Sequence, residues 1–113
     1  MPLCLDHFKK LAKENNITII AGAPIVVDSA MFIGQFIIAP DQSVSIYTKQ
    51  FLHEGEDEFF ISSFDYNPMI EIENKKISFA ICADIDNPKH PENASKKETD
   101  IYIASIFFSP NGI

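Results

Sequence analysis

The sequence predicts a single α/β domain in which helices cover at least one face of a sheet. Two observations predict it. Apolar residues recur at helical spacing near the start, and most later apolar residues fall in short runs rich in β-branched side chains. The expected order is helix, strand, hairpin strands, long loop, second hairpin, helix and strand, which is typical of α/β or α+β folds. No repeat or linker interrupts the chain, so residues 1–113 form one domain.

The first half of the chain predicts one helix and three strands. Leu5, Phe8 and Leu11 share one helical face, and a pair of asparagines ends this pattern at positions 15–16. The run ITIIAGAPIVV is apolar at both odd and even positions, as in a strand that is covered on both faces. MFIGQFIIAP predicts the second strand, DQS a turn, and VSIYTK a third strand that pairs back on the second.

The second half begins with a long polar and aromatic segment, QFLHEGEDEFFISSFDYNP, which predicts a loop. Loops of this length are uncommon in compact domains and are often functional. MIEIE and KISFAIC predict a hairpin joined by a turn at Asn74–Lys75. Pro88 and Pro91 predict the start of a short helix that runs to about Lys97. DIYIASIFF then predicts a final buried strand, followed by a turn in SPNGI.

Composition excludes several classes of function. The formal net charge is −7 and the chain contains no Arg, which argues against a nucleic-acid partner and against bidentate Arg clamps. No apolar run is long enough to span a membrane, and the first 16 residues carry charges that an export signal lacks. Cys4 and Cys82 are therefore expected as reduced thiols in the cytoplasm.

No motif predicts a cofactor or a metal. The three histidines are scattered and none is closely spaced with another histidine or with a cysteine, so a zinc site is not expected. There is no G-x-G-x-x-G sequence and no phosphate-binding loop. We expect neither a metal nor an organic cofactor.

Cys82 allows two interpretations. A cysteine beside Ala80 in an apolar strand is commonly a small core residue. Cys82 also ends its strand, lies on the face of small residues, and precedes a turn into a helix, where a thiolate nucleophile and an oxyanion site are commonly found. The spacing alone leaves these interpretations about equal.

Lys49 and the acidic run at 54–58 are also open to two interpretations. A lysine at a strand end is most often a solvated surface charge, and EGEDE is most often a solvated loop. Alternatively, Lys49 lies near the cysteine and stabilises a tetrahedral oxyanion, and one of the carboxylates orients its ammonium group. Periodicity does not indicate which carboxylate would do so.

Three blocks in one order resemble the nitrilase superfamily of carbon–nitrogen hydrolases. They are a Tyr-x-Lys block in YTKQFLHEGEDEFF, a Gly-Glu block that ends in aromatics, and an Ile-Cys-x-Asp block in KISFAICADIDNPKHPENA. DIYIAS and the upstream ITIIAGAPI are similar to the family as well. The resemblance covers nearly the whole chain.

The resemblance implies a catalytic mechanism and a set of site residues. In the family a Cys attacks an amide or nitrile carbon to form a thioester or thioimidate, a Lys stabilises the tetrahedral intermediate, and a Glu transfers protons. By motif match, Cys82 resembles the nucleophile, Lys49 the catalytic lysine, and Glu56 a second Glu that helps to hold the site. The backbone N–H of Ala83 would contribute to the oxyanion site.

The resemblance also implies a fold and a partial domain. The complete family domain is a four-layer α-β-β-α sandwich, of which this chain would form a part, with a mixed sheet and flanking helices. No residue here matches the general-base Glu, which precedes the first helix in the family. The chain is therefore expected to be a fragment, inactive by itself, that lacks this segment and a C-terminal part.

Two functions follow as expectations. The first is a cytoplasmic hydrolase that cleaves the C–N bond of a small non-peptide amide, nitrile or carbamoyl compound. The second is a non-catalytic remnant whose sheet binds a partner or forms homo-oligomers through exposed strand edges. Neither expectation includes a nucleic acid or a membrane as partner.

Overall fold

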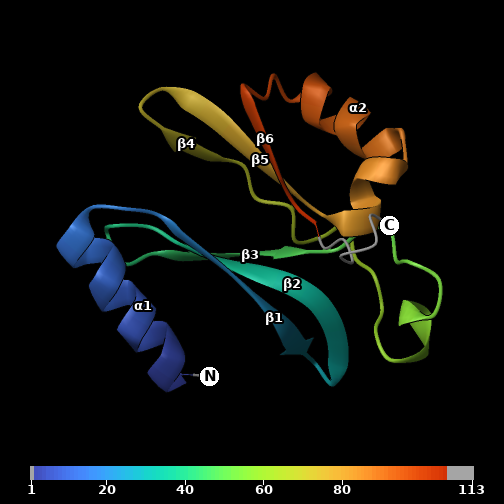
Figure 1. Ribbon diagram of the computed structural model, residues 1–113, viewed down its shortest axis with the longest axis horizontal. Coiled ribbons are helices and arrows are strands. Elements are labelled where there is room, and N and C mark those ends of the chain that lie inside the picture. Colours follow the sequence, from blue (N-terminus) through green and yellow to red (C-terminus); the bar gives the residue numbers. More distant parts are fainter. Residues whose placement is uncertain (1, 107–113) are drawn as a thin grey trace, which may run out of the picture.

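Two three-stranded sheets form the centre of the molecule in this computed structural model, which describes residues 2–106 (Figure 1). Sheet A is antiparallel with the order β1-β2-β3, and sheet B has the order β4-β5-β6. In sheet B, β4 is antiparallel and β6 is parallel to β5, so this sheet is mixed as expected. The strands are β1 (Ile19–Val27), β2 (Ala30–Ile38), β3 (Val44–Thr48), β4 (Ile70–Ile72), β5 (Lys75–Ile81) and β6 (Ile101–Ser105).

Helices flank the pair of sheets on both sides. Helix α1 (Pro2–Asn15) lies against sheet A, and helix α2 (Lys89–Lys96) lies on the far side of sheet B (Figure 1). The layers therefore follow the order α-β-β-α that the family resemblance implied. Two short 3₁₀ helices, η1 (Glu56–Glu58) and η2 (Cys82–Asp86), lie in the connections that follow β3 and β5. No helix among residues 2–106 is both long and apolar enough to cross a membrane.

The hydrophobic core lies between the two sheets. Ile37 and Tyr47 from sheet A meet Ile77 and Phe79 from sheet B, and all four are almost completely buried. Side chains alternate between the two faces of a strand, so Ile77 and Phe79 point together into this core. Partly buried isoleucines surround the cluster: Ile20, Ile70, Ile81 and Ile103.

Two-residue turns close two of the hairpins. Asp28–Ser29 joins β1 to β2, and Glu73–Asn74 joins β4 to β5, each with positive φ at both residues. Positive φ at both central positions is the type I′ arrangement, whose twist matches that of the strands. The second turn therefore lies one residue earlier than the Asn74–Lys75 turn expected from the sequence.

The burial of the first and last strands differs from expectation. In β1 only Ile25 is buried and Val26 is 62% exposed, so the strand is not covered on both faces. The predicted final strand is described only to Ser105, and Ile101 within it is 44% exposed. Within residues 2–106, β1 and β6 each pair with a single neighbour, which leaves one side of each strand open. The turn predicted for 109–113 lies outside the described residues.

Candidate active site

Lys49 immediately follows β3 and is buried. Its side chain is 1% exposed, and its Nζ donates a hydrogen bond to Glu56 Oε1 at 2.6 Å. Its backbone N–H donates to the Ile33 carbonyl at 2.8 Å, which extends the pairing of β3 with β2 beyond the strand end. A buried ammonium requires a counter-charge, so Lys49 is not the solvated surface charge that its position in the sequence allowed.

Glu56 is the member of the acidic run that turns inward. It opens η1, while Glu54, Asp57 and Glu58 are exposed. The Oε1 atom that binds Lys49 also accepts the backbone N–H of His53 at 2.6 Å. Burial raises the pKa of the Glu56 carboxyl, but these two hydrogen bonds and the charge of Lys49 outweigh it and hold the pKa below its ordinary value.

Cys82 lies at a corner and not within the strand. Strand β5 ends at Ile81, and Cys82 opens η2 with a φ of 43° and a partly buried side chain. A non-glycine residue in this region costs of order 1–3 kcal/mol and persists only where its surroundings hold it. The strand therefore ends one residue earlier than the sequence predicted, and Cys82 occupies the first position of the corner that follows it.

Asp84, two residues after Cys82, connects the two strand ends. Its carboxylate is completely buried, and Oδ1 accepts the backbone N–H groups of Gln50 at 2.9 Å and Phe51 at 2.8 Å. Oδ2 accepts the N–H of Ile81 at 3.0 Å and the hydroxyl of Tyr47. Sequence reasoning assigned no role to Asp84. The sequence signal that could have indicated a role for this residue was its place in the Cys-x-Asp block, directly after a buried strand.

A buried polar chain extends from Asp84 to strand β6. The Tyr47 hydroxyl lies 2.7 Å from His90 Nε2, and His90 Nδ1 lies 2.5 Å from the Tyr102 hydroxyl. Tyr47 donates to Asp84, so it accepts from Nε2–H of His90. In a neutral imidazole with this tautomer, Nδ1 accepts a hydrogen bond from the Tyr102 hydroxyl.

The pKa shifts in this chain agree with a neutral imidazole. Burial lowers the pKa of His90, and this effect and the charge of Lys97 outweigh the opposing effect of Asp84. Burial and the nearby charge of Asp84 raise the pKa of Tyr102 to about 12. The same two causes, together with the hydrogen bond to Asp84, raise the pKa of Tyr47 above its ordinary value by more. Among the described residues, no group of three or more His, Cys, Asp and Glu side chains is arranged to hold a metal ion.

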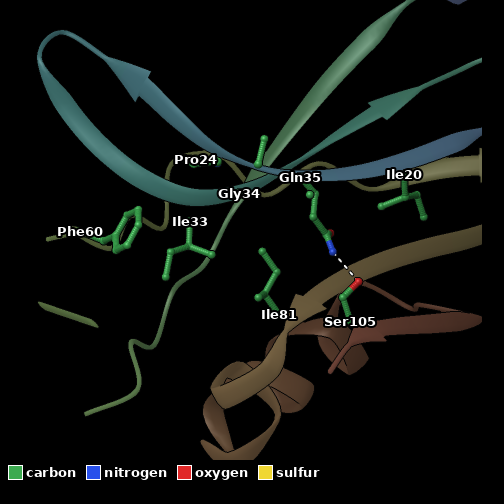
Figure 2. A pocket seen from close by; sticks show the side chains of 10 residues that line it. Ile20, Pro24, Ile33, Gly34, Gln35, Phe60, Ile81 and Ser105 are labelled. Atoms are coloured by element: carbon green, nitrogen blue, oxygen red, sulfur yellow. Dashed lines mark hydrogen bonds between the residues drawn. The ribbon is translucent and has the colours of Figure 1, made fainter. Parts of the chain in front are cut away.

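A cavity of about 420 Å³ opens between the sheets beside the Cys82 corner (Figure 2). Ile81, the residue before Cys82, lines it together with Pro24, Ile33 and other uncharged residues. Its polar groups include Gln35, which donates from Nε2 to Ser105 Oγ at 2.6 Å and whose buried Oε1 has no hydrogen-bond partner among residues 2–106. The cavity is therefore largely apolar, with one polar side.

Ala83 lines a second, more open cavity. Its volume is about 560 Å³, and its walls include Gln50 and Phe51, which follow Lys49, and Asn87 at the end of η2. The backbone of Ala83 is thus at the same junction of loop and corner as the segment after Lys49.

The structure brings three of the candidate residues into one region. Lys49 contacts Glu56 directly, and Asp84 ties the backbone after Lys49 to the backbone before Cys82. A thiol on a strained corner, a buried ammonium with a counter-ion and a hydrogen-bonded carboxylate are together suited to nucleophilic attack on a carbonyl carbon.

Comparisons with known proteins find similarity in structure. No family model matches the sequence, and no curated protein matches it. A CN-hydrolase superfamily protein from Xanthomonas campestris, with an arsenic adduct in its active site, matches with a TM-score of 0.84 and 14% identity over 96% of this chain. An amidase from Nesterenkonia sp. matches with a TM-score of 0.82 and 14% identity over 97% of this chain. A glutamine-dependent NAD⁺ synthetase from Acinetobacter baumannii matches with a TM-score of 0.80 and 15% identity over 93% of this chain.

The matches cover less than half of each solved structure. The chain spans 43% of the Xanthomonas protein, 43% of the amidase and 21% of the synthetase. The chain therefore has the fold of part of a carbon–nitrogen hydrolase domain, as its resemblance to the nitrilase superfamily implied.

Proposed function

We propose that this chain carries the nucleophile and the oxyanion site of a carbon–nitrogen hydrolase of the nitrilase type. One observation supports this most directly: Lys49 is buried against Glu56 at the strand end that Asp84 ties to the Cys82 corner. A lysine that is buried and paired at such a junction is more costly to place than a surface charge, which favours a role for it beyond solubility.

The proposed chemistry begins at the Cys82 sulfur. The thiolate attacks the carbonyl carbon of an amide, the S–C bond forms, and the electrons of the C=O bond move to oxygen. The Lys49 ammonium and the backbone N–H of Ala83 stabilise this oxyanion. Collapse of the intermediate breaks the C–N bond once the nitrogen has taken a proton from a general acid, so that ammonia or an amine leaves and a thioester remains on Cys82. Water then hydrolyses the thioester to the acid and the free thiol.

Glu56 has a positioning role in this proposal. Its carboxylate stays ionised at neutral pH and fixes the Lys49 ammonium through a 2.6 Å hydrogen bond. The resemblance assigns the proton transfers to a further Glu that has no counterpart among these 113 residues. The proposal for this chain therefore covers attack and oxyanion stabilisation, and we expect no complete turnover by the 113 residues alone.

The proposed substrate is a small uncharged amide. The described residues that line the cavity beside Ile81 carry no charged side chain, which disfavours a charged substrate. The similar Nesterenkonia amidase has been captured with butyramide and with the acetamide moiety of fluoroacetamide on its active site cysteine. The thiol of Cys82 is free, and the cytoplasm is the compartment that would keep it reduced.

Fluoroacetamide provides the test. A thiolate displaces fluoride as the S–C bond forms and the C–F bond breaks, and this reagent is slow with ordinary thiols. We expect the folded chain to label at Cys82 faster than the urea-unfolded chain, as measured by peptide mass spectrometry. Lys49→Met should slow the labelling about tenfold or more, because the proposal has the Lys49 ammonium stabilise the negative charge that reacts at this site. Equal rates for folded and unfolded chain would refute the proposal.

A second function, association through exposed sheet edges, is favoured by the apolar surface. Phe59 is 74% exposed, Val26 62% and Phe64 58%, and within residues 2–106 each outer strand pairs on one side only. Light scattering across a range of protein concentrations tests for homo-oligomers. A monomer at every concentration would argue against this function and would leave the thiol chemistry unaffected.

A further inference from the structure

We propose that Asp84 is a positioning residue that holds the Lys49 ammonium and the Cys82 thiol in register. The inference rests on the proposed function, in which these two groups act on the same carbonyl. Asp84 lies at the junction of the two sheets. Among the described residues its backbone partners are Gln50, Phe51 and Ile81, which stand beside the two reacting groups in the chain.

The argument begins with how the two strand ends are connected. Lys49 follows β3 in sheet A and Cys82 follows β5 in sheet B, and no ladder of backbone hydrogen bonds joins these sheets among the described residues. Oδ1 of Asp84 accepts the N–H of Gln50, next to Lys49. Oδ2 accepts the N–H of Ile81, next to Cys82. One rigid carboxylate therefore sets the separation of the two backbones.

A carboxylate is required by the number of donors. Four donors point at Asp84: three backbone N–H groups and the Tyr47 hydroxyl. An ionised carboxylate accepts at both oxygens and donates nothing, whereas an amide places an N–H₂ group at one of the two positions. In Asp84→Asn, the amide oxygen would still accept hydrogen bonds from the N–H groups at one strand end. The amide N–H₂ group would face the N–H groups at the other strand end, where no acceptor would remain.

The charge of Asp84 and its positioning role have opposite effects on Cys82. A buried negative charge close to the thiol disfavours the thiolate, so its removal alone would speed alkylation. If Asp84 instead keeps the Lys49 ammonium near the sulfur, its removal would separate the two groups and slow alkylation. The sign of the change therefore separates the two effects.

The experiment compares Asp84→Asn with Asp86→Asn as a matched control. Asp86 is in the same 3₁₀ helix, loses the same charge and is exposed. We expect Asp84→Asn to slow fluoroacetamide labelling of Cys82 about tenfold. Asp86→Asn should stay within about twofold, and labelling of Cys4 in the same molecules should not change. A Cys82 rate in Asp84→Asn equal to or above that of the wild type would overturn the inference.

A double variant distinguishes positioning from general structural support. If Asp84 acts through Lys49, then adding Asp84→Asn to Lys49→Met should not slow Cys82 further, since only the removed charge remains to act. A general structural role would slow Cys82 in both backgrounds and would contradict the inference.

A milder pair of variants decides the matter where Asp84→Asn does not fold. Tyr47→Phe and Tyr102→Phe each remove a hydroxyl next to His90, but only the Tyr47 hydroxyl donates to Asp84. We expect Tyr47→Phe to slow Cys82 labelling and Tyr102→Phe to leave it unchanged; equal effects would contradict the inference. If Cys82 in the folded wild type is labelled no faster than in the unfolded chain, the proposed function itself is refuted, before any variant is compared.

Discussion

The pairing of Lys49 with Glu56 predicts an asymmetry between two substitutions. Lys49 is 1% exposed, whereas the Glu56 side chain is 31% exposed. Glu56→Gln keeps an acceptor for the Lys49 ammonium and for the His53 N–H but removes the counter-charge. Lys49→Met removes the buried charge itself and leaves a carboxylate that water can reach.

The expected magnitudes follow from this difference in burial. Loss of one partner from a buried ion pair costs about 3–5 kcal/mol when the remaining charge is fully buried. The retained hydrogen bonds and the partial exposure at position 56 reduce this loss of unfolding free energy, so we expect Glu56→Gln to cost about 2–3 kcal/mol. Lys49→Met should stay within about 1 kcal/mol of the wild type, because the charge that remains is the partly exposed Glu56 carboxylate, which water can solvate. The double variant should be more stable than Glu56→Gln alone.

Urea unfolding followed by far-ultraviolet circular dichroism measures these free energies, since the chain has no Trp to report by fluorescence. With a slope of about 1–3 kcal/mol per molar urea, Glu56→Gln should lower the midpoint by about 0.7–3 M. The pKa of Glu56 is depressed, so its contribution is present above the ordinary value of 4.5 and is lost as pH falls through the folded pKa. The difference from the wild type should therefore shrink on acidification. A Lys49→Met variant less stable than Glu56→Gln would refute this reasoning.

Three further predictions concern stability. The pKa of His90 is lowered, so neutral His90 stabilises the fold at pH above the ordinary pKa of 6.5, and this contribution is lost as the pH falls below that value. The urea midpoints at pH 7.5 and pH 5.5 should therefore differ less in His90→Gln than in the wild type. An equal difference in the two proteins would contradict the assignment. Gly34→Ala should cost about 1–3 kcal/mol, because the added methyl would lie 2.9 Å from a backbone carbonyl oxygen of β3, whereas Gly22→Ala meets nothing closer than 3.9 Å and serves as control. Replacing Glu73 by Asn and Asn74 by Gly should raise the unfolding free energy by about 0.5–1 kcal/mol, since both residues have positive φ; a thermal midpoint at or below that of the wild type would count against the type I′ assignment.

Much of the fold could be predicted from the sequence because it depends on local pattern. Helical spacing in the first 15 residues predicted the first helix, the two prolines at 88 and 91 predicted the second, and the apolar runs predicted the six strands, with the Glu73–Asn74 turn displaced by one residue. The burial of β1 could not be predicted from its composition, because apolar residues at both parities do not reveal whether another element covers the outer face.

The sequence by itself determined which residues could take part in chemistry: a cysteine at a strand end, a lysine at another and an acidic run between them. It left open whether Lys49 was solvated and which carboxylate faced it. These questions depend on contacts between segments far apart in the chain, and periodicity describes only neighbours along it. The tertiary structure decided them: it buries Lys49 against Glu56, turns Cys82 out of the strand, and places Asp84 where one carboxylate accepts hydrogen bonds from both strand ends.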